Sequence, residues 1–250
     1  NRTLRKLIRQ FGSLGGGNHF LELQRDSEEH VWIMLHSGSR YLGVEIRDYY
    51  VAEGQRLEGI DQKLYSRIPH FLADSSIGVD YLQDIQSVRE FARESRREMM
   101  LRALEVVQRH VPGLDTASIL GRAVDVSHNY VALEEYFGER IYIHRKGAIH
   151  LAKGDTGFVP GSMGTASYVV EGRDNEYAFC SCAHGGGRAM SRAAAARSIS
   201  QKQLRESMDG ILCAHDGLLL DEAPDAYKDI RTVMRGQSDL VKILYELHPV

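Results

Sequence analysis

The stretch NHFLELQRDSEEHVWIMLHSGSR, residues 18–40, says more about the fold than any other part of this chain. It contains two apolar runs, residues 20–23 and 31–35, separated by a charged loop from Arg25 to Glu29. Two such runs on either side of a short polar loop predict a β-hairpin. His19 and His36 lie at the ends of the two predicted strands, which makes them the first candidates for chemistry.

Outward from this hairpin, helical periodicity and strand-like runs alternate along the chain. The pattern predicts helices over residues 43–57, 79–110, 188–197, 200–207 and 237–247, and strands over 140–144, 148–151, 157–159 and 168–170. Pro112 and Gly113 end the longest of these helices. Helix and strand interleave without a change in composition, so we expect one domain over residues 1–250.

Composition indicates a soluble protein and sets limits on its partners. Hydrophobic residues make up 43% of the 250 residues and charged residues 26%, which is ordinary for a globular domain. No apolar run approaches the roughly 18 residues that a membrane helix needs. The three cysteines are an odd number that does not suit a disulfide framework, so we expect a reducing, cytoplasmic location. A net charge of −3 does not by itself indicate a nucleic-acid binder.

Four of the eleven histidines lie in glycine-rich or polar turns, namely His19, His36, His128 and His184. Imidazole binds manganese, zinc or iron well when carboxylate or thiolate ligands join it. Histidines from separate strand ends can therefore build a metal centre. The alternative is that each imidazole bonds a neighbouring loop, and the spacing of these residues does not decide between the two interpretations.

Two glycine runs, residues 15–17 and 185–187, present backbone N–H groups with no Cβ in the way. The second run precedes the predicted helix from Arg188, whose first turn would favour an anion. His184 stands directly before this run, and a histidine beside bound phosphate can attack phosphorus. The alternative is a glycine turn that permits close packing.

Three further features have structural interpretations at least as good as functional ones. Residues 160–167, PGSMGTAS, can bind a nucleotide or close a turn. Tyr227 can stack on a base or lie at an exposed helix edge. The arginines of the 79–110 helix alternate with glutamates, which favours a solvated face over a surface for RNA.

Five motifs in order resemble the RtcB family of RNA ligases: GSLGGGNHFLE (12–22), LHSGSR (35–40), HNY (128–130), PGSMGTASY (160–168) and AHGGGRAMSR (183–192). The resemblance runs from about Gly12 to the end of the chain. It implies an α+β fold with mixed sheets and flanking helices.

The resemblance also implies an activity. Members of the family join RNA ends that carry a 3′-phosphate or 2′,3′-cyclic phosphate to 5′-hydroxyl ends, in tRNA splicing or RNA repair. A histidine accepts GMP from GTP and passes it to the RNA 3′-phosphate, and this nucleophile resembles His184. The complete enzyme uses two Mn²⁺ ions. The implied partners are RNA, as tRNA halves or broken ends, and an archease-type activator.

Motif matching assigns the remaining roles. The residues that resemble metal ligands are His19, His36 and His128. Those that resemble nucleotide-binding positions are Asn18, Glu22, Asn129, Ser162, Ser167, Gly185, Gly187, Arg188 and Tyr227.

The chain departs from the family pattern at both ends. An Asp-x-Gly-Cys-Gly segment, which supplies an aspartate and a cysteine to the metal site, is absent, and so is a final Lys-Gly. We therefore expect a catalytic core shortened at both ends, without the N-terminal part of the fold. Two rival functions follow from the same residues: a manganese-dependent phosphoesterase or nuclease, and a non-catalytic RNA-binding paralogue.

Overall fold

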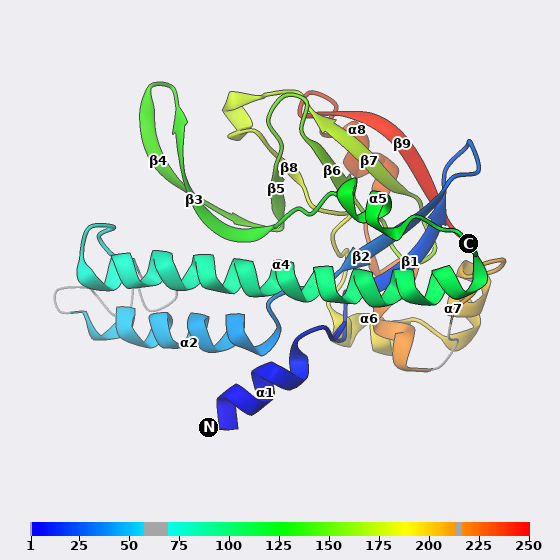
Figure 1. Cartoon of the computed structure of the whole chain (residues 1–250), viewed down its shortest axis with the longest axis horizontal. Coiled ribbons are helices and arrows are strands. Elements are labelled where there is room, and N and C mark those ends of the chain that lie inside the picture. The colour runs from blue at the N-terminus through cyan, green and yellow to red at the C-terminus, as the bar shows by residue number, and fades with distance from the viewer. Residues whose placement is uncertain (1, 58–69, 214–216) are drawn as a thin grey trace. The chain divides into compact units, whose positions relative to one another are not determined.

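The computed structural model describes residues 2–57, 70–213 and 217–250, and the chain forms two compact units. Unit 1 comprises Asn1–Gly15 and Ser37–Ser118, and unit 2 comprises Gly16–His36 and Ile119–Val250. Unit 1 is helical, whereas the strands of the described ranges all lie in unit 2 (Figure 1). The α+β class is thereby confirmed, and the single domain over residues 1–250 stays a prediction. None of the described helices is long and apolar enough to cross a membrane.

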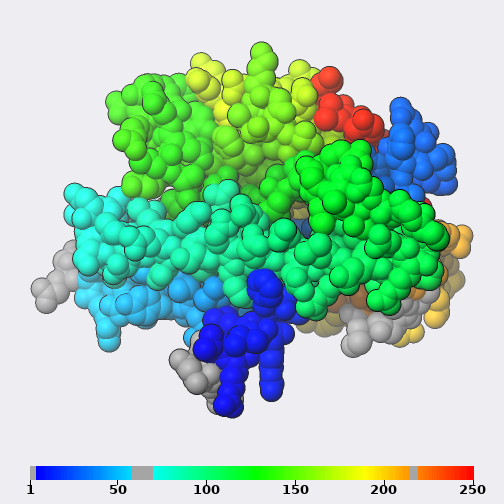
Figure 2. Space-filling view, viewed as in Figure 1, coloured from blue at the N-terminus to red at the C-terminus, as the bar shows by residue number. Residues whose placement is uncertain are grey.

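Unit 1 is built on two helices that lie side by side, α2 (Arg40–Arg56) and α4 (Ser76–His110), after a short N-terminal helix α1 (Arg2–Gln10) (Figures 1 and 2). Both long helices confirm the periodicity of the sequence. The Ser75 hydroxyl caps α4 by accepting a hydrogen bond from the Gly78 N–H at 3.1 Å. The helix ends directly before Pro112 and Gly113, as predicted.

Polar and aromatic contacts join the helices of unit 1. Tyr50 of α2 is buried, and its hydroxyl donates to Asp84 of α4 at 2.8 Å. Its ring lies 5.0 Å from that of Tyr81, edge to face. Several α4 arginines pair with glutamates of the same helix, for example Arg102 with Glu98 at 2.7 Å, which is the pattern of a solvated face.

Unit 2 contains one five-stranded sheet, in the order β2-β1-β9-β7-β6, and two strand pairs, β3-β4 and β5-β8. The strands are β1 (Phe20–Arg25), β2 (Val31–His36), β3 (Asn129–Tyr136), β4 (Glu139–Lys146), β5 (Ala148–His150), β6 (Thr156–Val159), β7 (Ser167–Gly172), β8 (Ser181–Ala183) and β9 (Val241–Pro249). Within the described ranges the strand ladders are antiparallel, where the resemblance implied mixed sheets. Short turns such as those of β1-β2 and β3-β4 can join antiparallel strands only.

The predicted hairpin is confirmed as β1 and β2, in a register that sets Phe20 opposite His36. Asp26 organises its turn by accepting hydrogen bonds from the Trp32 indole at 2.9 Å and the His30 backbone at 3.0 Å. Burial opposes the charged form of Asp26, but these bonds outweigh burial and lower the pKa of the carboxyl. Beyond the turn, Met34 packs with Val169 and Leu247 in a core of the five-stranded sheet.

Two predicted helices of unit 2 need correction. The helix predicted over residues 237–247 is wrong, because the segment forms β9 from Val241 and pairs with both β7 and β1. The helix predicted from Arg188 begins at Arg192, because the Arg188 backbone pairs with Tyr227 instead. The glycine run therefore does not lead directly into a helix, and the argument from a helix N-terminus does not apply.

The remaining helices of the described ranges are short. They are α5 (Thr116–Gly121), η1 (Glu176–Ala178), α6 (Arg192–Ser198), α7 (Gln201–Ser207), η2 (Gly217–Glu222), η3 (Pro224–Ala226) and α8 (Ile230–Arg235). The α7 helix confirms the prediction for residues 200–207, and Ser200 and Gln203 form a capping box at its start. Helix α8 packs Ile230 and Met234 into the core against Val170 of β7.

Candidate active site

Four histidine rings that lie far apart in the sequence gather in unit 2. The His36 ring lies 5.1 Å from that of His128 and 5.9 Å from that of His19, between centroids. The His184 ring lies 4.5 Å from His128 and 6.1 Å from His36. His19 and His128 directly precede β1 and β3, His36 is the last residue of β2, and His184 directly follows β8. The structure thus brings together all four turn histidines that the sequence singled out.

The Gly147 carbonyl orients the His184 ring. Its Nδ1 lies 2.8 Å from the carbonyl oxygen of Gly147, so Nδ1 carries the proton and donates it. Burial lowers the pKa of His184, which favours the neutral ring. In this tautomer Nε2 carries a lone pair, as a nucleophile requires.

His36 and His128 fit a shared metal ion. Their Nε2 atoms are 3.2 Å apart, and two nitrogens that each lie about 2.1 Å from one ion are separated by roughly 3.0–3.5 Å. Within residues 2–57, 70–213 and 217–250, no group of three or more His, Cys, Asp or Glu side chains is placed to hold a metal ion. The described part of the chain therefore offers a pair of imidazoles in suitable positions, with His19 next to them.

The Gly185–Gly187 run follows His184 without regular structure. The Gly186 N–H donates to the carbonyl of Pro160 at 2.9 Å, and a Cβ at Gly185 would lie 3.1 Å from the same oxygen. Gly187 has a φ of +72°, which favours glycine. The run thus packs closely on the Pro160 turn, in agreement with the interpretation of a glycine turn that permits close packing. The same packing keeps backbone amides beside His184.

A second polar group lies on the inner side of β1. Gln24 is fully buried and its Nε2 donates to Glu22 and to the Ser167 hydroxyl, both at 3.0 Å. Burial raises the pKa of Glu22 to about 7 against the lowering effect of the Gln24 bond. The Gly161 N–H also donates to Ser167, at 3.3 Å. Two of the predicted nucleotide-binding residues, Glu22 and Ser167, are therefore joined through one glutamine.

A third group contains the remaining charges. Arg192 donates to the Asn18 side chain at 3.3 Å and lies 3.2 Å from Glu222. Arg188 lies 3.1 Å from the same carboxylate and 3.3 Å from the Tyr227 hydroxyl. The predicted residues Asn18, Arg188 and Tyr227 are thus connected, through Arg192 and Glu222.

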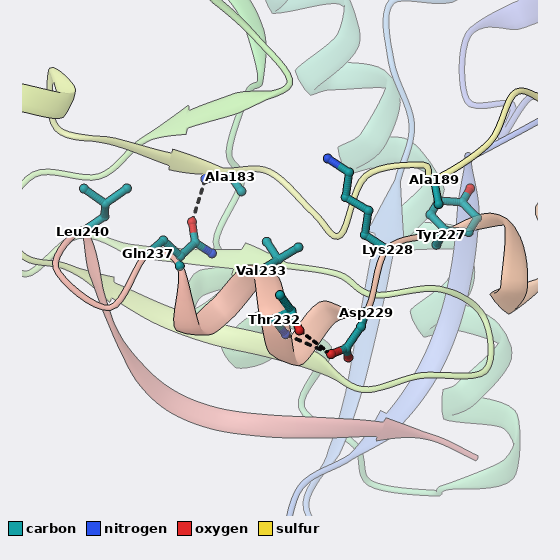
Figure 3. A pocket seen from close by; sticks show the side chains of 10 residues that line it. Ala183, Ala189, Tyr227, Lys228, Asp229, Thr232, Val233, Gln237 and Leu240 are labelled. Carbon is teal, nitrogen blue, oxygen red and sulfur yellow. Dashed lines mark hydrogen bonds between the residues drawn. The ribbon is translucent and has the colours of Figure 1, made fainter.

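Tyr227 also lines an open cleft of about 740 Å³. Figure 3 shows Ala183 and Ala189 on one side of it and the α8 residues Thr232 and Val233 on the other. Ala183 and Ala189 flank the segment that contains His184 and the glycine run. Lys228, whose backbone N–H donates to the Gly187 carbonyl at 2.9 Å, lines the same cleft.

Two predicted residues make local bonds. Ser162 closes a turn, with its N–H donating to the Thr165 hydroxyl at 2.7 Å. The Asn129 side chain accepts a weak bond from Lys146 at 3.4 Å, across the β3-β4 ladder. These contacts agree with the turn interpretation of Ser162 and leave the nucleotide-binding role of both residues a prediction.

Sequence reasoning missed Gln24, Gly147 and Glu222. Gln24 had a usable signal, because residues two apart on a strand face the same side and Glu22 was already a candidate. Gly147 and Glu222 lie outside the motifs and act through a backbone carbonyl and a distant ion pair.

The whole chain, residues 1–250, matches the family model described as "tRNA-splicing ligase RtcB". The RNA-splicing ligase RtcB of Escherichia coli K12 is 40% identical over 248 residues, covering 97% of this chain and 60% of the relative. The RNA-splicing ligase RtcB of Mycobacterium tuberculosis H37Rv is 32% identical over 292 residues, covering 100% of this chain and 66% of the relative. The tRNA-splicing ligase RtcB of Pyrococcus furiosus is 31% identical over 288 residues, covering 96% and 29%.

These similarities extend over nearly all of this chain, although the chain spans about three fifths of the length of the E. coli relative. The family match includes each of the five motifs and each histidine of the cluster. The chain belongs to the RtcB family.

Proposed function

We propose that this chain carries the nucleotide-transfer centre of an RNA ligase, which joins RNA 3′-phosphate or 2′,3′-cyclic phosphate ends to 5′-hydroxyl ends. The names of its relatives as RNA-splicing and tRNA-splicing ligases support the reaction class. The observation that carries the proposal is the His184 ring, whose Nδ1 is bonded to the Gly147 carbonyl at 2.8 Å. That bond leaves Nε2 as the nucleophilic atom.

The proposed reaction on a 3′-phosphate end has three steps, and a 2′,3′-cyclic phosphate end must first be opened by water, which breaks the P–O2′ bond and leaves a 3′-phosphate. His184 Nε2 attacks the α-phosphorus of GTP, a P–N bond forms, and pyrophosphate leaves with the electrons of the broken P–O bond. The RNA 3′-phosphate then takes the guanylate and His184 is released. The 5′-hydroxyl finally attacks the activated 3′-phosphorus and displaces GMP. The guanylate turns a poor electrophile into an activated diphosphate.

Other residues of the site would bind and orient the reactants. His36, His128 and His19 would hold Mn²⁺, which when bound screens phosphate charge and orients the attacking and leaving oxygens. Glu22 and Ser167 would bind the guanine nucleotide together with Asn18 and Asn129. Tyr227 and the Gly185–Gly187 run would flank the nucleotide next to His184.

The test is incubation of the chain with GTP labelled on its α-phosphate and with Mn²⁺, followed by denaturing electrophoresis. We expect a labelled protein band that His184→Ala abolishes and that His248→Ala, an exposed histidine on β9, leaves unchanged. Because a phosphoramidate is acid-labile, brief acid treatment should remove the label. A band that persists in His184→Ala would overturn the nucleophile assignment. No band in the unaltered chain would favour a phosphoesterase or a non-catalytic protein.

A further inference from the structure

Glu222, at the end of η2, lies between two arginines that follow the glycine run. Its Oε2 is 3.1 Å from Arg188 Nη1 and its Oε1 is 3.2 Å from Arg192 Nε. The Tyr227 hydroxyl donates to Oε2 as well. The Glu222 side chain is 11% exposed, so this carboxylate makes its contacts away from bulk water. One carboxylate thus links three side chains, and the Asp221 carboxylate lies 3.9 Å from Arg192 Nε as a second, more distant partner.

Arg188 is largely committed to the protein. Its Nε donates to the Met190 carbonyl at 3.0 Å, its Nη1 faces Tyr227 and Glu222, and its Nη2 donates to the Asp221 carbonyl. Three of its five N–H groups make these hydrogen bonds, and the Glu222 carboxylate pairs with Nη1. Arg188 therefore fixes the segment from Asp221 to Tyr227 beside the glycine run.

Arg192 is different, because its side chain is 52% exposed and keeps N–H groups available to an anion. Glu222 holds its Nε, and the Asn18 side chain accepts from its Nη2 at 3.3 Å. Its guanidinium lies over Gly17, where an added Cβ would come 1.9 Å from Nη2. Arg192 therefore spans from η2 to the first glycine run, and Glu222, at 3.2 Å, is the nearer of its two carboxylate partners.

We propose that Glu222 is a positioning residue of the nucleotide site, which fixes the Arg192 guanidinium so that its outward N–H groups bind the phosphates of GTP. This inference rests on the proposed function. A carboxylate serves this role better than an amide, because Gln would present an NH₂ group to one of the two guanidinium groups. Aspartate keeps the charge but is one methylene shorter, so it reaches one arginine well and the other poorly.

The first test measures GTP affinity by calorimetry in the unaltered chain and in Glu222→Gln, Glu222→Asp and Glu206→Gln. Glu206 is an exposed carboxylate of α7 paired with Lys202, and it serves as the matched control. We expect Glu222→Gln to raise the Kd about tenfold, since the ion pair that orients the arginine is lost, and Glu222→Asp to have an intermediate effect. Glu206→Gln should leave the Kd unchanged.

Arg192→Ala provides a second route to the same contact, because it removes the guanidinium that Glu222 pairs with. If Glu222 acts through Arg192, the double variant should bind GTP about as weakly as Arg192→Ala alone. This comparison keeps the inference testable should Glu222→Gln fold poorly.

The outcomes separate the two proposals. If the unaltered chain binds no GTP, the proposed function and this inference both fail. If the unaltered chain binds GTP but Glu222→Gln binds it equally well or more tightly, the inference alone fails, and tighter binding would identify Glu222 as a competitor for phosphate. Multiplicative effects of Arg192→Ala and Glu222→Gln would likewise contradict an action of Glu222 through Arg192.

Discussion

The carboxyl group of Glu22 on β1 is half-buried, and its surroundings favour the neutral form. Burial raises its pKa to about 7, and the hydrogen bond from Gln24 offsets this only in part. Carboxyl groups with a raised pKa are common at functional sites, where burial prepares a group to interact with a ligand. In the proposed function the ligand is the guanine edge, whose N–H groups would donate hydrogen bonds to the carboxylate.

The raised pKa of Glu22 predicts a pH-dependent cost to folding. Between the unfolded value of 4.5 and about 7 the folded state binds more protons than the unfolded state, so stability falls as pH rises through this range. Glu22→Gln should match the unaltered chain near pH 4 and exceed it by about 1–3 kcal/mol near pH 8. Urea unfolding at both pH values measures the difference. A difference that does not grow with pH, or that Glu206→Gln reproduces, would contradict the assignment.

At the scale of single residues, motif order was sufficient to nominate the histidine cluster. His19, His36, His128 and His184 occur in separate glycine-rich or polar turns, and the structure brings their rings within contact of one another. Motif order could not reveal Gly147, because its contribution is a carbonyl oxygen that any residue possesses. The tautomer of His184 thus depends on tertiary structure that no local pattern encodes.

Among the elements, the β3-β4 hairpin forms a long curved ribbon (Figure 1), and a buried ion pair joins its two strands. Arg145 is 2% exposed at its side chain and pairs with Glu134, and it also donates to the Phe179 carbonyl and, at 3.0 Å, to the Ser181 hydroxyl. Burial opposes the charge of Glu134, but the bonds from Arg145 and Tyr136 outweigh it and lower the pKa of the carboxyl. The pair ties the hairpin to the segment that precedes His184.

Removal of the Glu134 carboxylate should therefore leave a buried guanidinium without its counter-charge. We expect Glu134→Ala to lower the free energy of unfolding by about 3–5 kcal/mol. The matched control is Glu135→Ala, an exposed position on the opposite face of β3, which should change it by less than about 0.5 kcal/mol. Chemical denaturation checks both variants. Equal effects would show that the ion pair contributes nothing specific.

The sequence predicted the elements unevenly, for reasons visible in the packing. The β1-β2 hairpin carries two apolar runs around a charged loop, α4 carries helical periodicity, and both elements are confirmed. The Val241–Pro249 segment fits either pattern locally, and pairing with β7 and β1 decides for a strand. The start of α6 at Arg192 depends on the Arg188–Tyr227 backbone pairing, which a local pattern cannot indicate.

In the molecule as a whole, the residues predicted to carry the chemistry all lie in unit 2. Every predicted metal-binding, nucleotide-binding and nucleophilic residue lies in Gly16–His36 or Ile119–Val250. The α+β class followed from the resemblance and is confirmed, whereas the division into two compact units did not follow from composition, which changes nowhere along the chain. Two groups of contacts form within this one unit. One is the set of ring contacts among the four histidines, and the other is the chain of contacts that links Asn18 to Tyr227 through Arg192 and Glu222.

The most direct test of the central claim is the joining of two RNA strands by this chain. One strand carries a labelled 3′-phosphate and the other a 5′-hydroxyl, and both are incubated with the chain, GTP and Mn²⁺ and resolved by denaturing electrophoresis. The account predicts a longer product whose labelled phosphate resists phosphatase, formed only with GTP and absent in His184→Ala. Shortened or dephosphorylated RNA, formed equally without GTP, would contradict it and identify the chain as a phosphoesterase.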